Sequence, residues 1–231
     1  MRICGLLKLT LLDFPDHLAC TIFTGGCQFK CPFCQNSSLV FLKDDSKLIN
    51  EDEIFDFLNK RKGILDGVCI TGGEPTIQKD LIPFIKKIKS LGFKVKLDTN
   101  GYLPDVVKKL VEEKLVDYVA MDVKNSLAKY KETAGLLALR TEAIKESINF
   151  LKSGIVEHEF RTTVVKEFHD NNDFEEIGKL LRGEKRYFLQ QFEDSESCIQ
   201  KGLHAHSKET LEGFVEILKK YDVNASLRGI D

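Results

Sequence analysis

The sequence predicts an α/β fold in which about six parallel strands form an open β/α barrel. Strand-like apolar runs alternate with amphipathic helical segments along the chain, and parallel strands need such crossover connections. The 231 residues are 42% hydrophobic and 30% charged, which suffices for a substantial core in a single domain over residues 1–231. The strand and helix units are too few for a closed eight-stranded barrel, and a flat doubly wound sheet is the structural alternative.

The expected elements follow one another in alternation. Strands are expected at the short apolar runs 19–24, 67–71, 94–98, 117–123, 157–165 and 186–192, with 224–229 as a candidate for a last strand. Helices are expected where apolar residues recur with helical spacing, at 51–62, 79–92, 104–114, 140–153, 174–181 and 208–221. Pro104 begins one of these helices, while Gly92 and Gly154 end two others, as these residue types commonly do.

Polar segments follow the expected strands directly. They are the cysteine loop after the first strand, "TGGEP" (71–75) after the second, "DTNG" (98–101), "MDVK" (121–124), Arg161 within the fifth strand, and "QQF" (190–192). Because the C-terminal ends of parallel barrel strands lie on the same rim, these segments are expected to form one site.

Charge and cysteine content limit the kinds of partner and compartment. The formal net charge of −2 gives no global basic field for nucleic acid. Lys8, Asp13 and Asp16 interrupt the apolar start, and no run has membrane-spanning length, so we expect a cytoplasmic protein with neither membrane nor nucleic-acid partners. In a reducing cytosol, clustered thiols indicate metal or redox chemistry, whereas Cys20 and Cys69 lie in apolar runs and are expected in the core.

The segment "CQFKCPFC" holds three thiols, those of Cys27, Cys31 and Cys34, in a loop too short for a core of its own. A structural zinc site needs four closed ligands, and a disulfide needs well-separated pairs. Three thiolates can instead bind three irons of a cubane cluster and leave the fourth iron open. The alternatives are a zinc knuckle completed by His17, and an electron-transfer iron–sulfur protein, which would need a fourth ligand.

The other rim residues suit the binding of a charged ligand. Gly72–Gly73 lack Cβ atoms and allow close approach of the backbone to a ligand, and the Glu74 carboxylate can accept hydrogen bonds from an ammonium group. Asp98 and Asp122 end neighbouring strands, where paired carboxylates could hold a cation or organise a ligand. Lys124 can neutralise a ligand carboxylate.

Together, "CQFKCPFC", with Phe33 as the aromatic residue before the last cysteine, and the following "TGGEP" resemble the radical S-adenosylmethionine (SAM) enzymes. The resemblance covers nearly the whole chain, through "DTNG", "MDVK", "RTTVV" and "LQQF". The segment "LLDFPDHLACTIFTGGCQFKCPFCQNSSL" resembles glycyl-radical-enzyme activating enzymes, closest to the anaerobic ribonucleoside-triphosphate reductase activating proteins and next to the pyruvate formate-lyase activators. Gln35, Asn36 and Ser37 depart from the His-Asn and proline that often follow the third cysteine there.

This resemblance implies a role for each candidate residue. Cys27, Cys31 and Cys34 would ligate a [4Fe-4S] cluster whose open iron is chelated by the amino and carboxylate groups of SAM. The remaining implied SAM contacts are Gly72, Gly73 and Glu74 at the amino group, Asp98, Thr99 and Asp122 at a monovalent cation site beside SAM, and the polar residues Lys124 and Arg161.

The resemblance also implies a reaction and partners. A reduced cluster would cleave SAM to methionine and a 5'-deoxyadenosyl radical, which takes hydrogen from a glycine Cα of a large glycyl radical enzyme. A flavodoxin- or ferredoxin-like protein would supply the electron. Only Cys69 lies between Cys34 and Gly72, so we expect one cluster and no ferredoxin-like insert. The rival enzymatic hypothesis is a radical SAM enzyme that modifies a small molecule.

Overall fold

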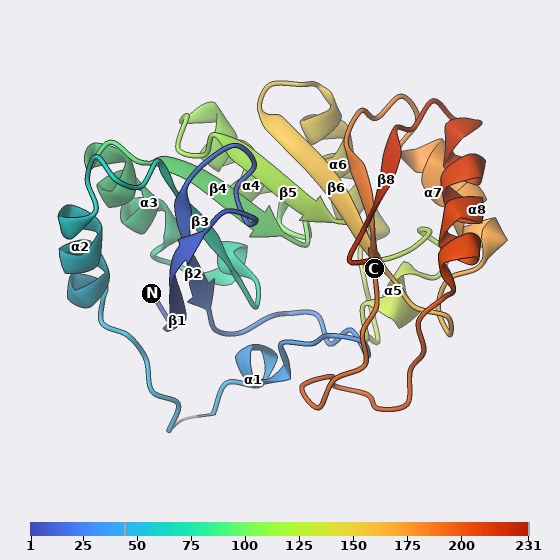
Figure 1. Cartoon of the computed structure of the whole chain (residues 1–231), viewed down its shortest axis with the longest axis horizontal. Helices are drawn as coiled ribbons and strands as arrows, with labels where there is room; N and C mark the ends of the chain where they lie inside the picture. The colour runs from blue at the N-terminus through green and yellow to red at the C-terminus, as the bar shows by residue number, and fades with distance from the viewer. Residues whose placement is uncertain (44, 231) are drawn as a thin grey trace.

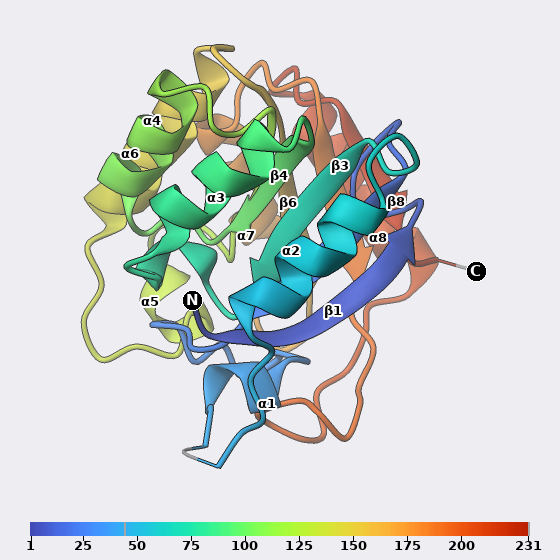
Figure 2. The same ribbon diagram turned by 90° about the vertical axis from the view of Figure 1, so that its left-hand side faces the viewer.

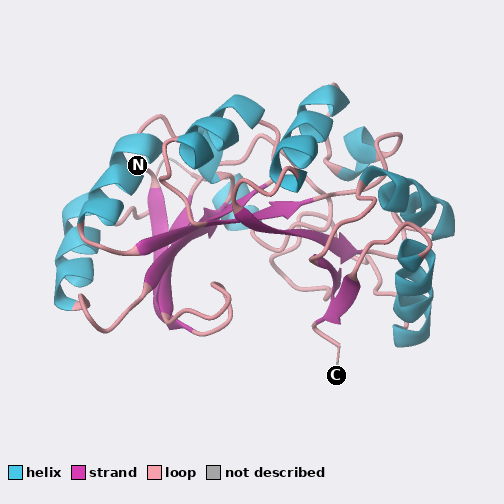
Figure 3. Ribbon diagram, turned by 90° about the horizontal axis from the view of Figure 1, so that it is seen from above, coloured by secondary structure: helices cyan, strands magenta, loops and turns pink. Residues whose placement is uncertain are grey.

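The computed structural model describes residues 1–43 and 45–230, and these form a curved sheet of eight strands (Figures 1 and 3). The strands pair in chain order: β1 (Ile3–Thr10), β2 (Ala19–Thr24), β3 (Gly67–Gly72), β4 (Lys94–Thr99), β5 (Tyr118–Asp122), β6 (Glu157–Val164), β7 (Tyr187–Gln191) and β8 (Ala225–Arg228). Strand β1 is antiparallel to β2, and each later pair is parallel. Because β1 and β8 are the two edges, the predicted open β/α barrel is confirmed.

The six predicted strands correspond to β2–β7, and the candidate strand at 224–229 corresponds to β8. Strand β1 was not predicted. In this edge strand (Figure 2), Leu7 and Leu9 are 45% and 57% exposed and Lys8 between them is exposed as well. The segment therefore lacks the alternation of buried and exposed residue types from which a strand is recognised.

The helices are α1 (Ser37–Val40), α2 (Glu51–Lys60), α3 (Leu81–Ser90), α4 (Pro104–Glu112), α5 (Tyr130–Thr133), α6 (Thr141–Lys152), α7 (Asn171–Leu180) and α8 (Lys208–Lys219). The six longer ones cover the convex face of the sheet (Figure 3), whereas α1 lies beyond the strand ends (Figure 1). The six longer helices confirm the predicted segments, and α7 begins earlier than expected because Asp170 and Asp173 form a capping box. Within the described residues, no helix is long and apolar enough to cross a membrane.

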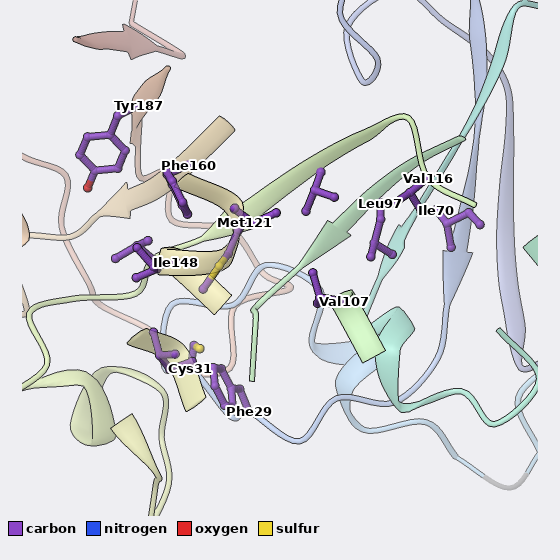
Figure 4. Packing of buried hydrophobic residues seen from close by; sticks show 14 of the residues in the cluster. Phe29, Cys31, Ile70, Leu97, Val107, Val116, Met121, Ile148, Phe160 and Tyr187 are labelled. Carbon is purple, nitrogen blue, oxygen red and sulfur yellow. The ribbon is translucent and has the colours of Figure 1, made fainter. Parts of the chain in front are cut away.

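The outward face of the sheet forms the hydrophobic core with these helices. Leu97, Met121 and Phe160 point from neighbouring strands into the same core cluster as Ile148 of α6 (Figure 4). This core cluster runs through helices and strands from both ends of the chain.

The inward face of the same strands is charged. Lys96, Asp98, Asp122, Glu159 and Arg161 form a chain of ion pairs across β4, β5 and β6. Lys96 is only 2% exposed, whereas Asp122 at the rim is 31% exposed, so the network runs from the buried barrel interior to the open rim. Along these strands, successive side chains therefore point alternately toward the apolar core under the helices and toward the charged interior that leads to the site.

Candidate active site

A cavity of about 240 Å³ opens at the C-terminal ends of the strands. All eleven candidate residues named from the sequence line it: Cys27, Cys31, Cys34, Gly72, Gly73, Glu74, Asp98, Thr99, Asp122, Lys124 and Arg161. They come from strands β3–β6 and from the loops that follow β2, β3 and β5, as expected if the C-terminal strand ends meet at one rim.

Main-chain hydrogen bonds to distant segments hold the cysteine loop in place. The Lys30 N–H donates to the Ala134 carbonyl at 2.8 Å, and the Ile199 N–H donates to the Cys34 carbonyl at 3.2 Å. Gly135 has a positive φ of 64°, and a Cβ atom there would overlap the Lys30 carbonyl oxygen. The loop is therefore fixed from two sides, by the connection after β5 and by the segment after β7.

Two of the three thiols, those of Cys27 and Cys31, lie in a weakly hydrated environment. Burial raises the pKa of Cys27 to about 12 and the pKa of Cys31 to about 11. Metal ions bind thiolates, so metal binding at these residues has to release their protons. Among residues 1–43 and 45–230, no three His, Cys, Asp or Glu side chains converge on the position of a single metal ion.

Gly72 and Gly73 allow two segments of the backbone to pack closely against each other. A Cβ atom at Gly73 would overlap the Gly26 carbonyl oxygen, and one at Gly72 would overlap the backbone of Thr24. The Glu74 N–H donates to the Gly26 carbonyl at 2.8 Å, which joins this loop to the start of the cysteine loop. The sequence indicated close approach of this backbone to a ligand, whereas the structure shows that both glycines lie against the backbone of Thr24 and Gly26.

The Glu74 side chain is 1% exposed, and both of its carboxylate oxygens accept hydrogen bonds from the protein. Its Oε1 accepts hydrogen bonds from Thr76 N at 3.0 Å, Thr76 Oγ1 at 2.6 Å and Thr99 Oγ1 at 2.8 Å, while Oε2 accepts from Asn100 N at 2.7 Å. Burial raises the pKa of Glu74, and these donors oppose that rise. Glu74 therefore ties the loop after β3 to the end of β4.

Two carboxylates at the rim share one guanidinium. Arg161 Nε lies 3.0 Å from Asp122 Oδ1, and Arg161 Nη1 lies 3.2 Å from Asp98 Oδ2. Lys124 Nζ and Lys96 Nζ add a second contact to each carboxylate, at 3.1 Å from Asp122 and 2.6 Å from Asp98. Although burial opposes ionisation of Asp122, the charges of Arg161 and Lys124 hold its pKa at about 2. In this structure Arg161 supplies the positive charge at the place where the resemblance implies a monovalent cation.

Several cavity residues were not assigned a role from the sequence. Asn36, Asn100 and Thr163 also line the cavity. The strand period could have found Thr163, because it lies two residues beyond Arg161 and so on the same face of β6. His17, the proposed fourth zinc ligand, lies before β2 and contacts Lys94 Nζ at 2.9 Å, whereas the cysteine loop follows β2.

Comparisons with known proteins agree with this arrangement. Residues 21–181 match the family model described as "Radical SAM superfamily". The chain is 37% identical, over 99% of its length and 96% of the relative, to a "Putative glycyl-radical enzyme activating enzyme" of Methanocaldococcus jannaschii.

Solved structures show the same fold at low sequence identity. A domain of pyruvate-formate lyase-activating enzyme from Bacteroides vulgatus matches with a TM-score of 0.58 at 18% identity, over 71% of this chain and 99% of that one. Streptococcus suis SuiB bound to S-adenosylmethionine matches with a TM-score of 0.68 at 17% identity, over 89% of this chain and 49% of that one. The chain therefore belongs to the radical SAM superfamily and, within it, to the family of glycyl-radical-enzyme activating enzymes.

Proposed function

We propose that this enzyme installs a glycyl radical on a partner enzyme, with a [4Fe-4S] cluster on Cys27, Cys31 and Cys34 and SAM in the adjoining cavity. Radical SAM enzymes use these two cofactors. The observation that carries the proposal is the convergence of three thiols, three carboxylates and two cationic side chains on one cavity at the barrel rim. Bound together, the cluster and SAM supply a carbon-centred radical that abstracts hydrogen.

The donor set fits a cubane better than a single ion. Thiolates are soft ligands suited to iron–sulfur clusters. Cys27, Cys31 and Cys34 line one cavity. Three thiolates can each bind a different iron of a cubane, which would leave the fourth iron free for SAM.

The chain's own residues would bind and orient SAM. Lys124 and Arg161 are held as cations at the cavity and are suited to pairing with the SAM carboxylate. The Glu74 carboxylate already accepts four hydrogen bonds inside the protein. We therefore assign recognition of the SAM amino group to the backbone of Gly72–Gly73. The monovalent cation beside Asp98, Thr99 and Asp122 would have to share these carboxylates with Arg161.

The role of Asp122 gives a first expected result. Asp122→Ala removes the hydrogen bonds that position Arg161 and Lys124, so affinity for SAM should fall on the order of tenfold, about 1.4 kcal/mol. The cluster should assemble normally, because Asp122 is not one of its ligands. Isothermal titration with SAM and iron analysis measure the two effects, with Glu146→Ala at an exposed ion pair as the control. Loss of the cluster in Asp122→Ala would assign Asp122 a structural role instead.

Iron content tests the expectation of a single cluster. The only cysteine between Cys34 and Gly72 is Cys69, which is fully buried in the sheet. Reconstitution under anaerobic conditions should therefore yield about four irons and four sulfides per chain. A reproducible content near twice that value would contradict the single-cluster expectation.

The proposal also names the partner enzyme that receives the glycyl radical. Resemblance in the cysteine segment favours an anaerobic ribonucleoside-triphosphate reductase, while the fold likeness to a pyruvate-formate lyase-activating enzyme keeps a lyase of that type as second candidate. We place the reaction in the cytoplasm, with a flavodoxin- or ferredoxin-like protein as electron donor.

Electron paramagnetic resonance on mixtures with each candidate partner tests this assignment. The reduced enzyme with SAM should produce a glycine-centred signal on the reductase, and its absence there beside a signal on the lyase would reassign the partner. Turnover of a small molecule with no radical on either protein would favour the rival hypothesis.

A further inference from the structure

Asn100 follows β4 and is 5% exposed, and it lines the cavity beside the cysteine loop. Its Nδ2 lies 3.9 Å from Cys27 Sγ, within the range of a hydrogen bond to sulfur. The Phe29 N–H is a second donor to the same sulfur, at 3.3 Å. Cys27 thus receives N–H groups from its own loop and from the segment that follows β4.

The surrounding donors fix the orientation of the Asn100 amide. Its Oδ1 accepts hydrogen bonds from Gln28 Nε2 at 3.2 Å and from Tyr102 N at 3.0 Å. Rotating the amide by half a turn would place its NH₂ group against the Tyr102 N–H, a backbone donor that cannot become an acceptor, so Nδ2 faces Cys27 Sγ.

The backbone of Asn100 is fixed as firmly as its side chain. Its N–H donates to the buried Glu74 Oε2 at 2.7 Å. Glu74 in turn donates its own N–H to Gly26, next to Cys27 in the sequence. The amide donor and the thiol that it contacts are therefore attached to one rigid unit.

From this geometry we propose that Asn100 is a positioning residue that donates a hydrogen bond to the Cys27 thiolate and raises the reduction potential of the bound cluster. The inference rests on the proposed function, which assigns the cluster to Cys27. Reduction adds negative charge to a cluster and its sulfurs, so an N–H donor at sulfur stabilises the reduced form more than the oxidised form. An activating enzyme needs a reduced cluster, and Asn100 makes that state easier to reach.

Potentiometric titration of the reconstituted enzyme, followed by electron paramagnetic resonance without SAM, tests the inference directly. Asn100→Leu removes the donor, and we expect the midpoint potential to fall by about 59 mV, a tenfold change in a one-electron equilibrium. Asn100→Asp keeps the shape and the two contacts at Oδ1 but places negative charge beside sulfur, so at mildly alkaline pH it should lower the potential at least as much. Tyr102→Phe, which keeps the backbone donor to Asn100, should match the native enzyme.

The outcomes separate this inference from the proposed function. If Asn100→Leu assembles no cluster, the midpoint potential of the isosteric Asn100→Asp variant tests the inference instead. Native potentials in variants that hold a native content of iron would overturn the inference alone. A native chain that assembles no cluster would overturn the proposed function, and this inference with it.

Discussion

Replacing Cys34 by alanine is expected to abolish cluster assembly and SAM cleavage while the fold persists. Cys34 is one of three thiols at the cavity, and the other two cannot hold a cubane with one open iron. Its side chain is only partly buried, at the edge of the core, so truncation should cost little stability. Iron content, the production of 5'-deoxyadenosine and thermal unfolding measure the three parts of this expectation.

Cys4→Ala is the matched control for this variant. Cys4 is also a half-buried free thiol, and it packs beside Gly25 at the start of the same loop. It should keep about four irons per chain and native SAM cleavage. Native iron and product in Cys34→Ala, or loss of both in Cys4→Ala, would contradict the assignment of the cluster ligands.

Glu74→Ala is expected to lower both the stability of the protein and its affinity for SAM. Truncation leaves the Asn100 and Thr76 backbone N–H groups buried without their acceptor, whereas the Thr76 and Thr99 hydroxyls can rotate toward other partners. The free energy of unfolding should fall on the order of 3 kcal/mol, measured by denaturant titration. SAM affinity should fall as well, because the loops that line the cavity lose their common anchor.

Glu74→Gln separates the anchoring role from direct contact with SAM. Glutamine keeps one acceptor oxygen but places an NH₂ group near the Asn100 N–H, so its stability should lie between those of the native and alanine variants. If Glu74→Ala unfolds like the native protein while SAM affinity collapses, the carboxylate contacts SAM directly and the anchoring role is wrong.

Much of the site could be predicted because its signals are local. Each strand of the barrel ends in a polar segment, and parallel topology brings such ends to one rim. The cysteine spacing and the glycine pair are likewise visible without tertiary information. Gly72 and Gly73 were expected to let the backbone approach a ligand, and the sequence could not show that the backbone of Thr24 and Gly26 lies against them.

The remaining features depend on tertiary contacts that a strand pattern does not encode. Lys96 has the spacing of a solvent-facing strand residue, yet it is 2% exposed because its face of β4 lines the charged barrel interior. A period of two separates the faces of a strand but does not distinguish water from an ionic interior. The anchoring role of Glu74 and the contact between Asn100 and Cys27 also arise only where separate loops meet.

Isotope transfer from the partner tests the central claim most directly. A glycyl radical enzyme carrying glycine deuterated at Cα would be incubated anaerobically with the reduced protein and SAM, and the 5'-deoxyadenosine would be analysed by mass spectrometry. The account predicts that one deuterium enters 5'-deoxyadenosine as a glycine-centred radical appears on the partner, and that Cys34→Ala gives neither. Deuterium-free 5'-deoxyadenosine and no glycine radical, with every glycyl radical enzyme of the source organism, would contradict it.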